Sequence, residues 1–461
     1  MAPGAFHNSS ERYDPPKCHP QTRVAVIQAI IDWIEDGQKT SFIMWLNGPA
    51  GAGKSAIAQE IAELFHKSGR LAASFFWSRY ADGRNNEERL IASLAYQLLI
   101  AIPSMRAYVE EGLEADPSIF TRSLEAQMES LIVEPLEKVF VHGHWQQDPV
   151  NSESDDPKLI VLDGLDECAT PDIQRYILTV ISRSVRKSRI PLLFIIASRP
   201  EQAIRDSFNN QPLFDITTRL TLDETYSPDD DIRLFLVESF ESVKRTHILR
   251  SRLPRDWPSE SAIGILVHKS SGQFIYAATV VKFVRSPRRR PSEQLDVILG
   301  ITAAGDGTPF SELDSLYRQI FSMVEDFPRA LEVLSLHFLS HSYEFNMAEI
   351  ETFLSYPCGD LQLILIDLHS VIDVPADGDN ESRPHVLHAS LEDFLMDSTR
   401  SRDFYLDKSQ AHERIARHCL QHIHNGSPSM NVWSVIPQLF RKLQAYYSSS
   451  SDKHPRCTQA P

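Results

Sequence analysis

The stretch Gly48-Pro-Ala-Gly-Ala-Gly-Lys54-Ser55 matches the pattern G-x-x-x-x-G-K-[S/T], in which a glycine-rich turn leads from a strand into a helix. It follows an apolar run at residues 41–46, which predicts a buried strand, and precedes residues 57–65, where apolar side chains recur at helical spacing. The backbone amides of such a turn and the N-terminus of the next helix bind phosphate. The order strand, loop, helix therefore predicts a nucleoside triphosphate site and disfavours a chance match.

Each part of this loop has an expected role in holding a nucleotide with Mg²⁺. The ammonium group of Lys54 is expected to reach the β- and γ-phosphates, and the Ser55 hydroxyl to ligate Mg²⁺. The residues expected to bind the nucleotide are Gly48, Pro49, Ala50, Gly51, Ala52, Gly53, Lys54, Ser55 and Ala56.

A second motif adds carboxylates to this site. Residues 158–167 read Lys-Leu-Ile-Val-Leu-Asp-Gly-Leu-Asp-Glu, an apolar strand that ends in acids, as in a Walker B segment. Asp163 is the expected Mg²⁺ ligand. Asp166 and Glu167 lie just beyond the strand end, where one of them could orient or deprotonate the attacking water, and the residues leave open which.

A third apolar run, residues 191–197, is followed by Ser198, Arg199 and Pro200. A guanidinium group at the end of a neighbouring strand could stabilise charge on the γ-phosphate, so Arg199 is a candidate catalytic residue. The alternative is an ordinary solvated or structural arginine.

The alternation of strands and helices around these motifs predicts an α/β P-loop NTPase fold, with a mostly parallel sheet flanked by helices. Strands are expected at residues 41–46, 71–77, 158–162 and 192–197, and the polar stretch 143–157 is expected to be a loop. Because sites in such sheets lie at the carboxyl ends of the strands, the three motif loops are expected to converge.

The motifs together resemble a family. The sequences Trp-Leu-Asn-Gly-Pro-Ala-Gly-Ala-Gly-Lys-Ser at 45–55, Leu-Asp-Gly-Leu-Asp-Glu at 162–167 and Ala-Ser-Arg-Pro at 197–200 are similar to the NACHT class of STAND NTPases, above all to fungal, NLR-like members with a nephrocystin-3-like N-terminal region. Further similar stretches lie at residues 18–24, 75–79, 271–278 and 387–395. The resemblance implies binding of ATP or ADP with Mg²⁺, weak ATP hydrolysis at most, self-association of the ATP-bound form, and signal transduction in innate immunity.

The resemblance also implies a winged-helix domain that closes on the nucleotide. Short apolar stretches at residues 371–374 and 386–387 flank the turn-forming residues 376–380, as the strands of a wing would. In the resembled family the histidine at the position of His388 contacts the β-phosphate of ADP. The alternative is a histidine that is hydrogen-bonded within the core of its own domain.

The expected domains are an N-terminal extension at 1–20, a nucleotide-binding domain at 21–205, a helical domain at 206–300, a winged-helix domain at 301–400, and a helical segment with a disordered Ser-rich tail at 401–461. Two features depart from the resembled family. Many members have a proline in a Gly-x-Pro context where this chain has Gly272-Gln273-Phe274, so ATP or GTP preference is not decided by the residues. No signalling domain is expected in the first 20 residues, and no repeat array is expected after residue 400.

The composition indicates where the protein is located and which kinds of partner it is expected to bind. The five cysteines form no C-x-x-C pair, and neither a signal peptide nor a membrane-spanning apolar run is evident, so a soluble cytoplasmic protein is expected. With 46 basic and 62 acidic residues the net charge is −16, and residues 341–400 hold two basic and 12 acidic residues. Such charge disfavours direct nucleic-acid binding. Protein partners are unknown, and a homo-oligomer is expected in the active form.

Three functional hypotheses remain open from the sequence: a nucleotide-dependent signalling switch, an active P-loop enzyme such as a kinase or remodelling ATPase, and a truncated nucleotide-binding scaffold without output. A minor alternative concerns His418, Cys419, His422 and His424, which include an i, i+4 pair that could ligate zinc. An ordinary helical surface is the other interpretation of that segment.

Overall fold

The structure is a computed structural model that describes residues 1–12, 15–79, 81–142, 158–187, 192–287, 289–300, 310–339, 345–375 and 382–425. The expected insert loop at 143–157, the expected wing turn at 376–380 and the Ser-rich tail lie outside these residues. The described chain divides into two compact units, Met1–Ser239 with Ile263–Ala277, and Phe240–Ala262 with the residues from Ala278 onward.

A five-stranded sheet forms the centre of the first unit. Its order is β2-β3-β4-β1-β5, and all neighbouring strands are parallel. The strands are β1 (Ile43–Asn47), β2 (Leu71–Phe76), β3 (Lys158–Asp163), β4 (Leu192–Ser198) and β5 (Thr217–Thr221). The four strands expected from apolar runs are confirmed to within two residues at each end. The expected parallel sheet flanked by helices is also confirmed.

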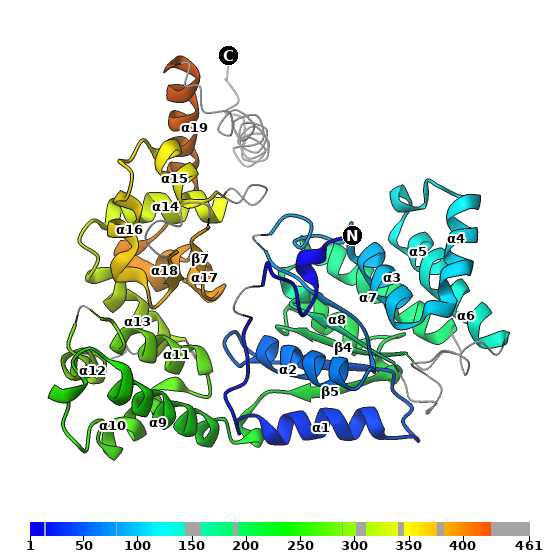
Figure 1. Ribbon diagram of the computed structural model, residues 1–461, viewed down its shortest axis with the longest axis horizontal. Helices are drawn as coiled ribbons and strands as arrows, with labels where there is room; N and C mark the ends of the chain where they lie inside the picture. Colours follow the sequence, from blue (N-terminus) through cyan, green and yellow to red (C-terminus); the bar gives the residue numbers. More distant parts are fainter. Residues whose placement is uncertain are drawn as a thin grey trace, which may run out of the picture. The chain divides into compact units, whose positions relative to one another are not determined.

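Helices cover both faces of this sheet, which explains why β1 to β4 are buried along their whole length. Met44, Leu46, Leu159, Val161 and Ile195 pack with α1 and α2 on one face. The alternate strand residues, such as Trp45, Leu162 and Ile196, pack with α3, α7 and α8 on the other face (Figure 1). The helices of this unit are α1 (Val24–Glu35), α2 (Lys54–Lys67), α3 (Leu90–Ala101), α4 (Arg106–Ala115), α5 (Leu124–Met128), α6 (Glu134–Val141), α7 (Pro171–Lys187) and α8 (Gln202–Asn209).

The predicted apolar face of the second helix is mostly confirmed. Ile57, Ile61 and Phe65 are buried on α2, whereas Leu64 is 42% exposed. At 100° per residue, Leu64 falls at the border of the buried stripe. The apolar spacing therefore predicted a wider buried face than the helix has.

The nucleotide domain was expected to end at residue 205, and this boundary omits a strand. β5 pairs in parallel with β1, with Ile43 opposite Thr217 and Asn47 opposite Thr221. Only Leu220 of its five residues is buried, because β5 is an edge strand. The polar sequence Thr-Thr-Arg-Leu-Thr therefore lacks the apolar run that identified the other four strands.

Helices α9 (Pro228–Thr246), α10 (Glu260–Ser270) and α11 (Phe274–Val284) each contribute residues to both units. The second unit contains in addition α12 (Pro291–Gly300), α13 (Ser311–Ser322), α14 (Phe327–Leu339), α15 (Met347–Leu354), α16 (Asp360–Leu365), α17 (Ser390–Leu395), α18 (Ser398–Ser401) and α19 (Lys408–Asn425). Two short antiparallel strands, β6 (Ile372–Asp373) and β7 (His385–Val386), pair Ile372 with Val386. These strands lie within or beside the two short apolar stretches that were expected to pair.

No single helix in the described ranges is long and apolar enough to span a membrane; only Leu90–Ala101 and Pro103–Ala115 taken together pass that test, and they are bent by 116°.

Candidate nucleotide-binding site

The loop between β1 and α2 has the backbone geometry of a phosphate cradle. Gly51 and Gly53 have φ values of +75° and +93°, in the left-handed region that favours glycine. Gly53 is the N-cap residue of α2, so the first amide groups of this helix lie at the loop. A Cβ atom on Gly51 would lie 2.1 Å from Cγ2 of Ile275, so any other residue at position 51 would displace that side chain.

The Lys54 side chain folds back over its own loop. Its Nζ atom donates hydrogen bonds to the carbonyl oxygens of Gly48 and Pro49, at 2.9 and 2.8 Å. Burial lowers the pKa of Lys54, while the charge of Asp166 acts in the opposite direction. Carbonyl oxygens are weaker partners for an ammonium ion than phosphate oxygens, so a bound polyphosphate can take over this lysine.

Asp163 lies at the carboxyl end of β3 and contacts the start of α2. Its carboxyl group shares a hydrogen bond with the Ser55 hydroxyl, and only 5% of the residue is exposed. Burial raises the pKa of Asp163 to about 6, although Ser55, Arg12 and Lys54 favour the ionised form. The two expected Mg²⁺ ligands, which are distant in sequence, are therefore in contact.

The two acids after Asp163 have different partners. Gly164, at φ +80°, begins a short 3₁₀ turn over Leu165–Glu167. Asp166 accepts a hydrogen bond from the backbone N–H of Arg199 at 2.9 Å and pairs with its Nε atom at 3.2 Å. Asp166 thus holds Arg199 in place. This contact agrees with the alternative that Arg199 is a structural arginine.

Glu167 has a backbone partner. Its Oε2 atom accepts a hydrogen bond from the backbone N–H of Arg79 at 3.2 Å. Burial first, and then the charge of Asp166, raise the pKa of Glu167 to about 7. A carboxylate with a pKa near neutrality suits proton abstraction from water at physiological pH.

Arg23 belongs to this site, and the sequence reasoning gave it no role. It precedes α1, is 4% exposed, and donates from Nη2 to the carbonyl oxygen of Ala52 at 2.7 Å. Its backbone N–H donates to Asp231 at 2.9 Å. The Nε and Nη1 atoms have no hydrogen-bond partner among the described residues. Buried donors without partners beside a phosphate loop fit a ligand that supplies acceptor atoms.

Phe274 occupies the position at which many members of the resembled family have proline. The Arg23 guanidinium lies 4.8 Å from the centroid of the Phe274 ring. The next residue, Ile275, donates its backbone N–H to the carbonyl oxygen of Gly51 at 3.4 Å. The start of α11 therefore contacts the phosphate loop, and an aromatic ring is present where the family pattern has a proline.

His388 belongs to the second unit, so its expected contact with a β-phosphate stays a prediction. Its Nδ1 atom accepts a hydrogen bond from the backbone N–H of Ser390 at 3.0 Å and lies 2.7 Å from the Ser390 hydroxyl. That hydroxyl is 2.9 Å from the Tyr317 hydroxyl. Because Nδ1 is an acceptor, the proton of the neutral ring is on Nε2.

The histidines considered for zinc have other partners. His418 lies 3.1 Å from Oε1 of Glu332, and Nε2 of His422 lies 2.9 Å from the carbonyl oxygen of Phe353. These contacts tie α19 to α14 and α15, which corresponds to the helical interpretation of the segment.

The five-stranded sheet, the glycine-rich loop and the Ser55–Asp163 contact define a P-loop NTPase. Residues 26–199 match the family described as Nephrocystin 3, N-terminal. Over these residues the chain is similar to that family, in agreement with the resemblance of its motifs to NACHT/STAND-like P-loop NTPases.

The chain is also similar to several solved structures. It resembles Cdc6p from Pyrobaculum aerophilum with 12% identity and a TM-score of 0.35, over 88% of this chain and 98% of that one. It resembles a chain of Drosophila ORC bound to DNA with 14% identity and a TM-score of 0.34, over 82% of this chain and 95% of that one. At such low TM-scores, these likenesses carry no weight in the assignment. A comparison with curated protein sequences found no match.

Proposed function

We propose that this protein is a nucleotide-dependent signalling switch of the STAND/NACHT type, which binds ATP or ADP with Mg²⁺. The contact between Ser55 and Asp163, beside the Lys54 loop, is the observation that carries this proposal. It brings a hydroxyl, a carboxylate and an ammonium group to one end of a parallel sheet, which is the donor set that Mg²⁺ and a polyphosphate require.

Binding uses several groups at once. The amides of residues 48–55 and the N-terminus of α2 cradle the phosphates, and Lys54 exchanges its carbonyl partners for phosphate oxygens. Bound Mg²⁺, held by Ser55 and Asp163, would neutralise charge on the phosphates. Nε and Nη1 of Arg23, which have no hydrogen-bond partner within the described ranges, are proposed to donate to the nucleotide.

Hydrolysis is expected to be slow. Glu167 is the proposed base that accepts a proton from water as the water oxygen attacks the γ-phosphorus and the bond to the leaving diphosphate breaks. Asp166 is the weaker candidate because its carboxylate is engaged by Arg199. Arg199 is likewise oriented by its Nε contact with Asp166, so its distance from a γ-phosphate depends on this pair.

The second unit supplies the proposed lid. Its short hairpin and helices are proposed to form a winged-helix domain, with His388 donating from Nε2 to the β-phosphate of ADP in the closed state. Moving such a switch fully requires about 5.5 kcal/mol of differential binding. One hydrogen bond supplies about 1 kcal/mol, so several phosphate contacts must change together.

The ATP-bound, open form is proposed to self-associate and to signal to protein partners, in a defence role like that of the fungal proteins it resembles. Direct nucleic-acid binding is not expected, because residues 341–400 carry two basic and 12 acidic residues.

Replacement of Lys54 tests this proposal. In Lys54→Ala, affinity for MgATP should fall by about 100-fold, since two or more charge-assisted bonds of about 1.5 kcal/mol each are lost. The control is Lys67→Ala, at the other end of α2. Calorimetry measures affinity, and sedimentation with ATP or ADP measures assembly. Equal assembly of Lys54→Ala and the unaltered chain, or turnover above about 1 per second, would contradict the switch.

A further inference from the structure

The first 12 residues pack into the first unit as part of its core. The backbone N–H of Ala2 donates to Oγ of Ser93 at 2.7 Å, and that of His7 donates to Oγ of Ser74 at 3.0 Å. Ala2, Ala5 and His7 are all buried. The segment therefore has a defined path along β2 and α3, and it ends beside the acidic end of the sheet.

Arg12 lies next to the strand position that neighbours Asp163. Its guanidinium carbon is 3.6 Å from the centroid of the Phe76 ring. Phe76 and Asp163 are register partners in the parallel pair β2–β3, so their side chains lie on the same face of the sheet. The stacked guanidinium thus lies on the side of Asp163 that faces away from β1.

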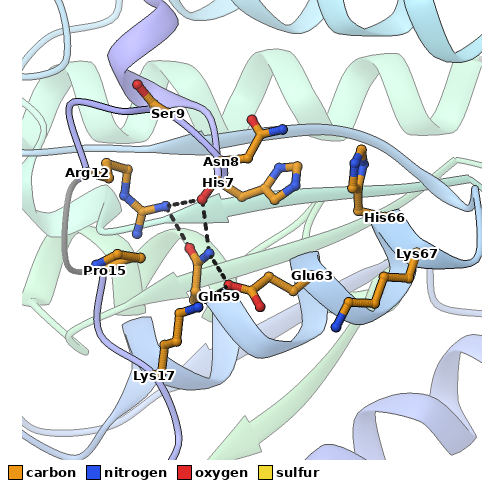
Figure 2. Close-up of a pocket in the computed structure, with 10 residues that line it drawn as sticks. All are labelled: His7, Asn8, Ser9, Arg12, Pro15, Lys17, Gln59, Glu63, His66 and Lys67. Atoms are coloured by element: carbon orange, nitrogen blue, oxygen red, sulfur yellow. Dashed lines mark hydrogen bonds and ion pairs between the residues drawn. The ribbon is translucent and has the colours of Figure 1, made fainter.

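A buried glutamine links Arg12 to the helix that carries Ser55. Nη1 of Arg12 donates to Oε1 of Gln59 at 2.7 Å, and Nε2 of Gln59 donates to the carbonyl oxygen of His7 at 2.9 Å (Figure 2). Gln59 is 1% exposed and lies about one turn after Ser55 on α2. Arg12 is therefore held against the same face of α2 that presents Ser55.

Among the described residues, only the Nη1 atom of Arg12 makes hydrogen bonds. Both of its hydrogen bonds, to Gln59 and to the carbonyl oxygen of His7, come from Nη1, and no partner for Nε or Nη2 is present among the residues that the structure describes. Arg12 also borders a pocket of about 350 Å³ that runs along α2 from Gln59 to Lys67, includes both Lys17 and Glu63, and contains no residue of the phosphate loop. Figure 2 shows the second terminal nitrogen of Arg12 without a bond to the residues drawn.

The side chain remains a cation at neutral pH. Burial lowers the pKa of Arg12 to about 10, and the charge of Asp163 opposes this shift. A planar guanidinium group with unoccupied N–H donors, partly shielded from water, is suited to bind two oxygens of a phosphate group.

We propose that Arg12 contacts the terminal phosphate of a bound nucleoside triphosphate and so distinguishes triphosphate from diphosphate. This inference rests on the proposed function. The phosphate loop follows β1. In the sheet, β4 separates β1 from β3, which carries Asp163, and β2, which carries Phe76, lies beyond β3. A polyphosphate that extends from the loop toward Asp163 brings its terminal group nearest to Arg12. Arg199, the cation expected there from the sequence, is held by Asp166.

The test compares affinities for MgATP and MgADP in the full chain, measured by calorimetry. Arg12→Gln should lower the affinity for MgATP by about 10- to 100-fold, the usual loss for a charge-assisted hydrogen bond. It should lower the affinity for MgADP by less than about threefold. Arg12→Lys should show an intermediate loss for MgATP. The matched control Lys17→Gln removes a charge from the same pocket and should change neither affinity by more than about twofold.

A second control separates direct contact from docking of the segment. Ser74→Ala removes the hydroxyl that holds His7 but leaves the Arg12 charge in place, so the ratio of ATP to ADP affinity should not change. Limited proteolysis within residues 1–17 reports whether the segment is still docked in each variant. If Arg12→Gln fails to fold, the ratio of MgATP to MgADP affinity in Arg12→Lys tests the inference.

Three results would overturn the inference: equal losses for MgATP and MgADP in both Arg12 variants, unchanged affinities in both, or the same selective loss of MgATP in Ser74→Ala. If the unaltered chain binds neither nucleotide, the proposed function fails instead.

Discussion

The two ends of the candidate phosphate site differ in how their charges are balanced. At the loop after β1, the Lys54 ammonium group already has two carbonyl partners from its own loop. At the turn after β3, burial raises the pKa of Asp163 to about 6 and that of Glu167 to about 7. Burial disfavours the charged form at both ends, since it also lowers the pKa of Lys54, but Lys54 has two carbonyl acceptors whereas the acidic turn keeps a larger electrostatic cost that a divalent cation would relieve.

The largest expected effect concerns the chemical role of the acidic turn. Glu167→Gln should reduce ATP hydrolysis by about 10²- to 10⁴-fold, because it removes the proposed general base. MgATP affinity should change little, since Asp163 and Lys54 are retained. Single-turnover hydrolysis and calorimetry on the same preparation measure the two quantities. Asp166→Asn is the comparison variant, and a larger rate loss there would transfer the role of base to Asp166.

The next effect concerns the pair that holds the turn together. Arg199→Ala leaves the carboxylate of Asp166, 4% exposed, without its guanidinium partner, and should lower the free energy of unfolding by about 3 kcal/mol. The matched control is Arg183→Ala, whose ion pair with Glu125 is more than half exposed on both sides and should cost less than about 0.5 kcal/mol. Chemical denaturation without nucleotide measures both. Equal costs would mean that the turn does not depend on this pair.

A smaller effect tests the stored electrostatic cost directly. Because the pKa values of Asp163 and Glu167 are raised, both groups are most favourable when protonated, and their contribution to stability falls as pH rises from about 4 to about 7. Asp163→Asn removes one of these costs. It should raise the free energy of unfolding of the nucleotide-free protein at pH 8 by about 1–3 kcal/mol and leave it nearly unchanged at pH 4.

Denaturation at the two pH values, without Mg²⁺ or nucleotide, measures this difference. Asp172→Asn, at the exposed start of α7, is the control and should have no such pH dependence. A destabilised Asp163→Asn at pH 8 would show that the carboxylate stabilises the fold and that the two ends of the site do not differ as described.

The smallest effect is a pH dependence of the rate. If Glu167 acts as the base, hydrolysis should increase about tenfold per pH unit below its pKa and level off above about pH 7. Initial rates between pH 5.5 and 8.5 at saturating MgATP measure the profile. A flat profile in that range would remove Glu167 from the proton transfer.

Much of the first unit could be predicted from local patterns. Strands β1 to β4 are apolar along their whole length because helices cover both faces of the sheet, and such runs are visible without any knowledge of partners. The same holds for the loop glycines and for Asp163, whose positions relative to a strand end indicate which side chains meet. Parallel strands bring their carboxyl ends to one edge, so the convergence of Ser55 and Asp163 was predictable.

Other parts of the site could not be predicted in this way. β5 lacks an apolar run because it is an edge strand, and it belongs to the sheet only through its pairing with β1. Arg12 and Arg23 lie in segments without periodicity, and nothing local indicates that one stacks on Phe76 and the other donates to Ala52. The partner of Arg199 was likewise hidden, since Asp166 is 33 residues away.

The sequence by itself determined that this chain has a phosphate loop, a carboxylate strand and a parallel sheet to join them, because those features depend on short-range spacing and on burial. Only the tertiary structure decided which charges are already paired. Lys54 folds onto its own carbonyls, Arg199 is bound by Asp166, and Arg12 is brought to the edge of the site by the N-terminal segment. The physical reason is that the strength of a charge interaction depends on distance and on solvent exposure, which are properties of the folded chain.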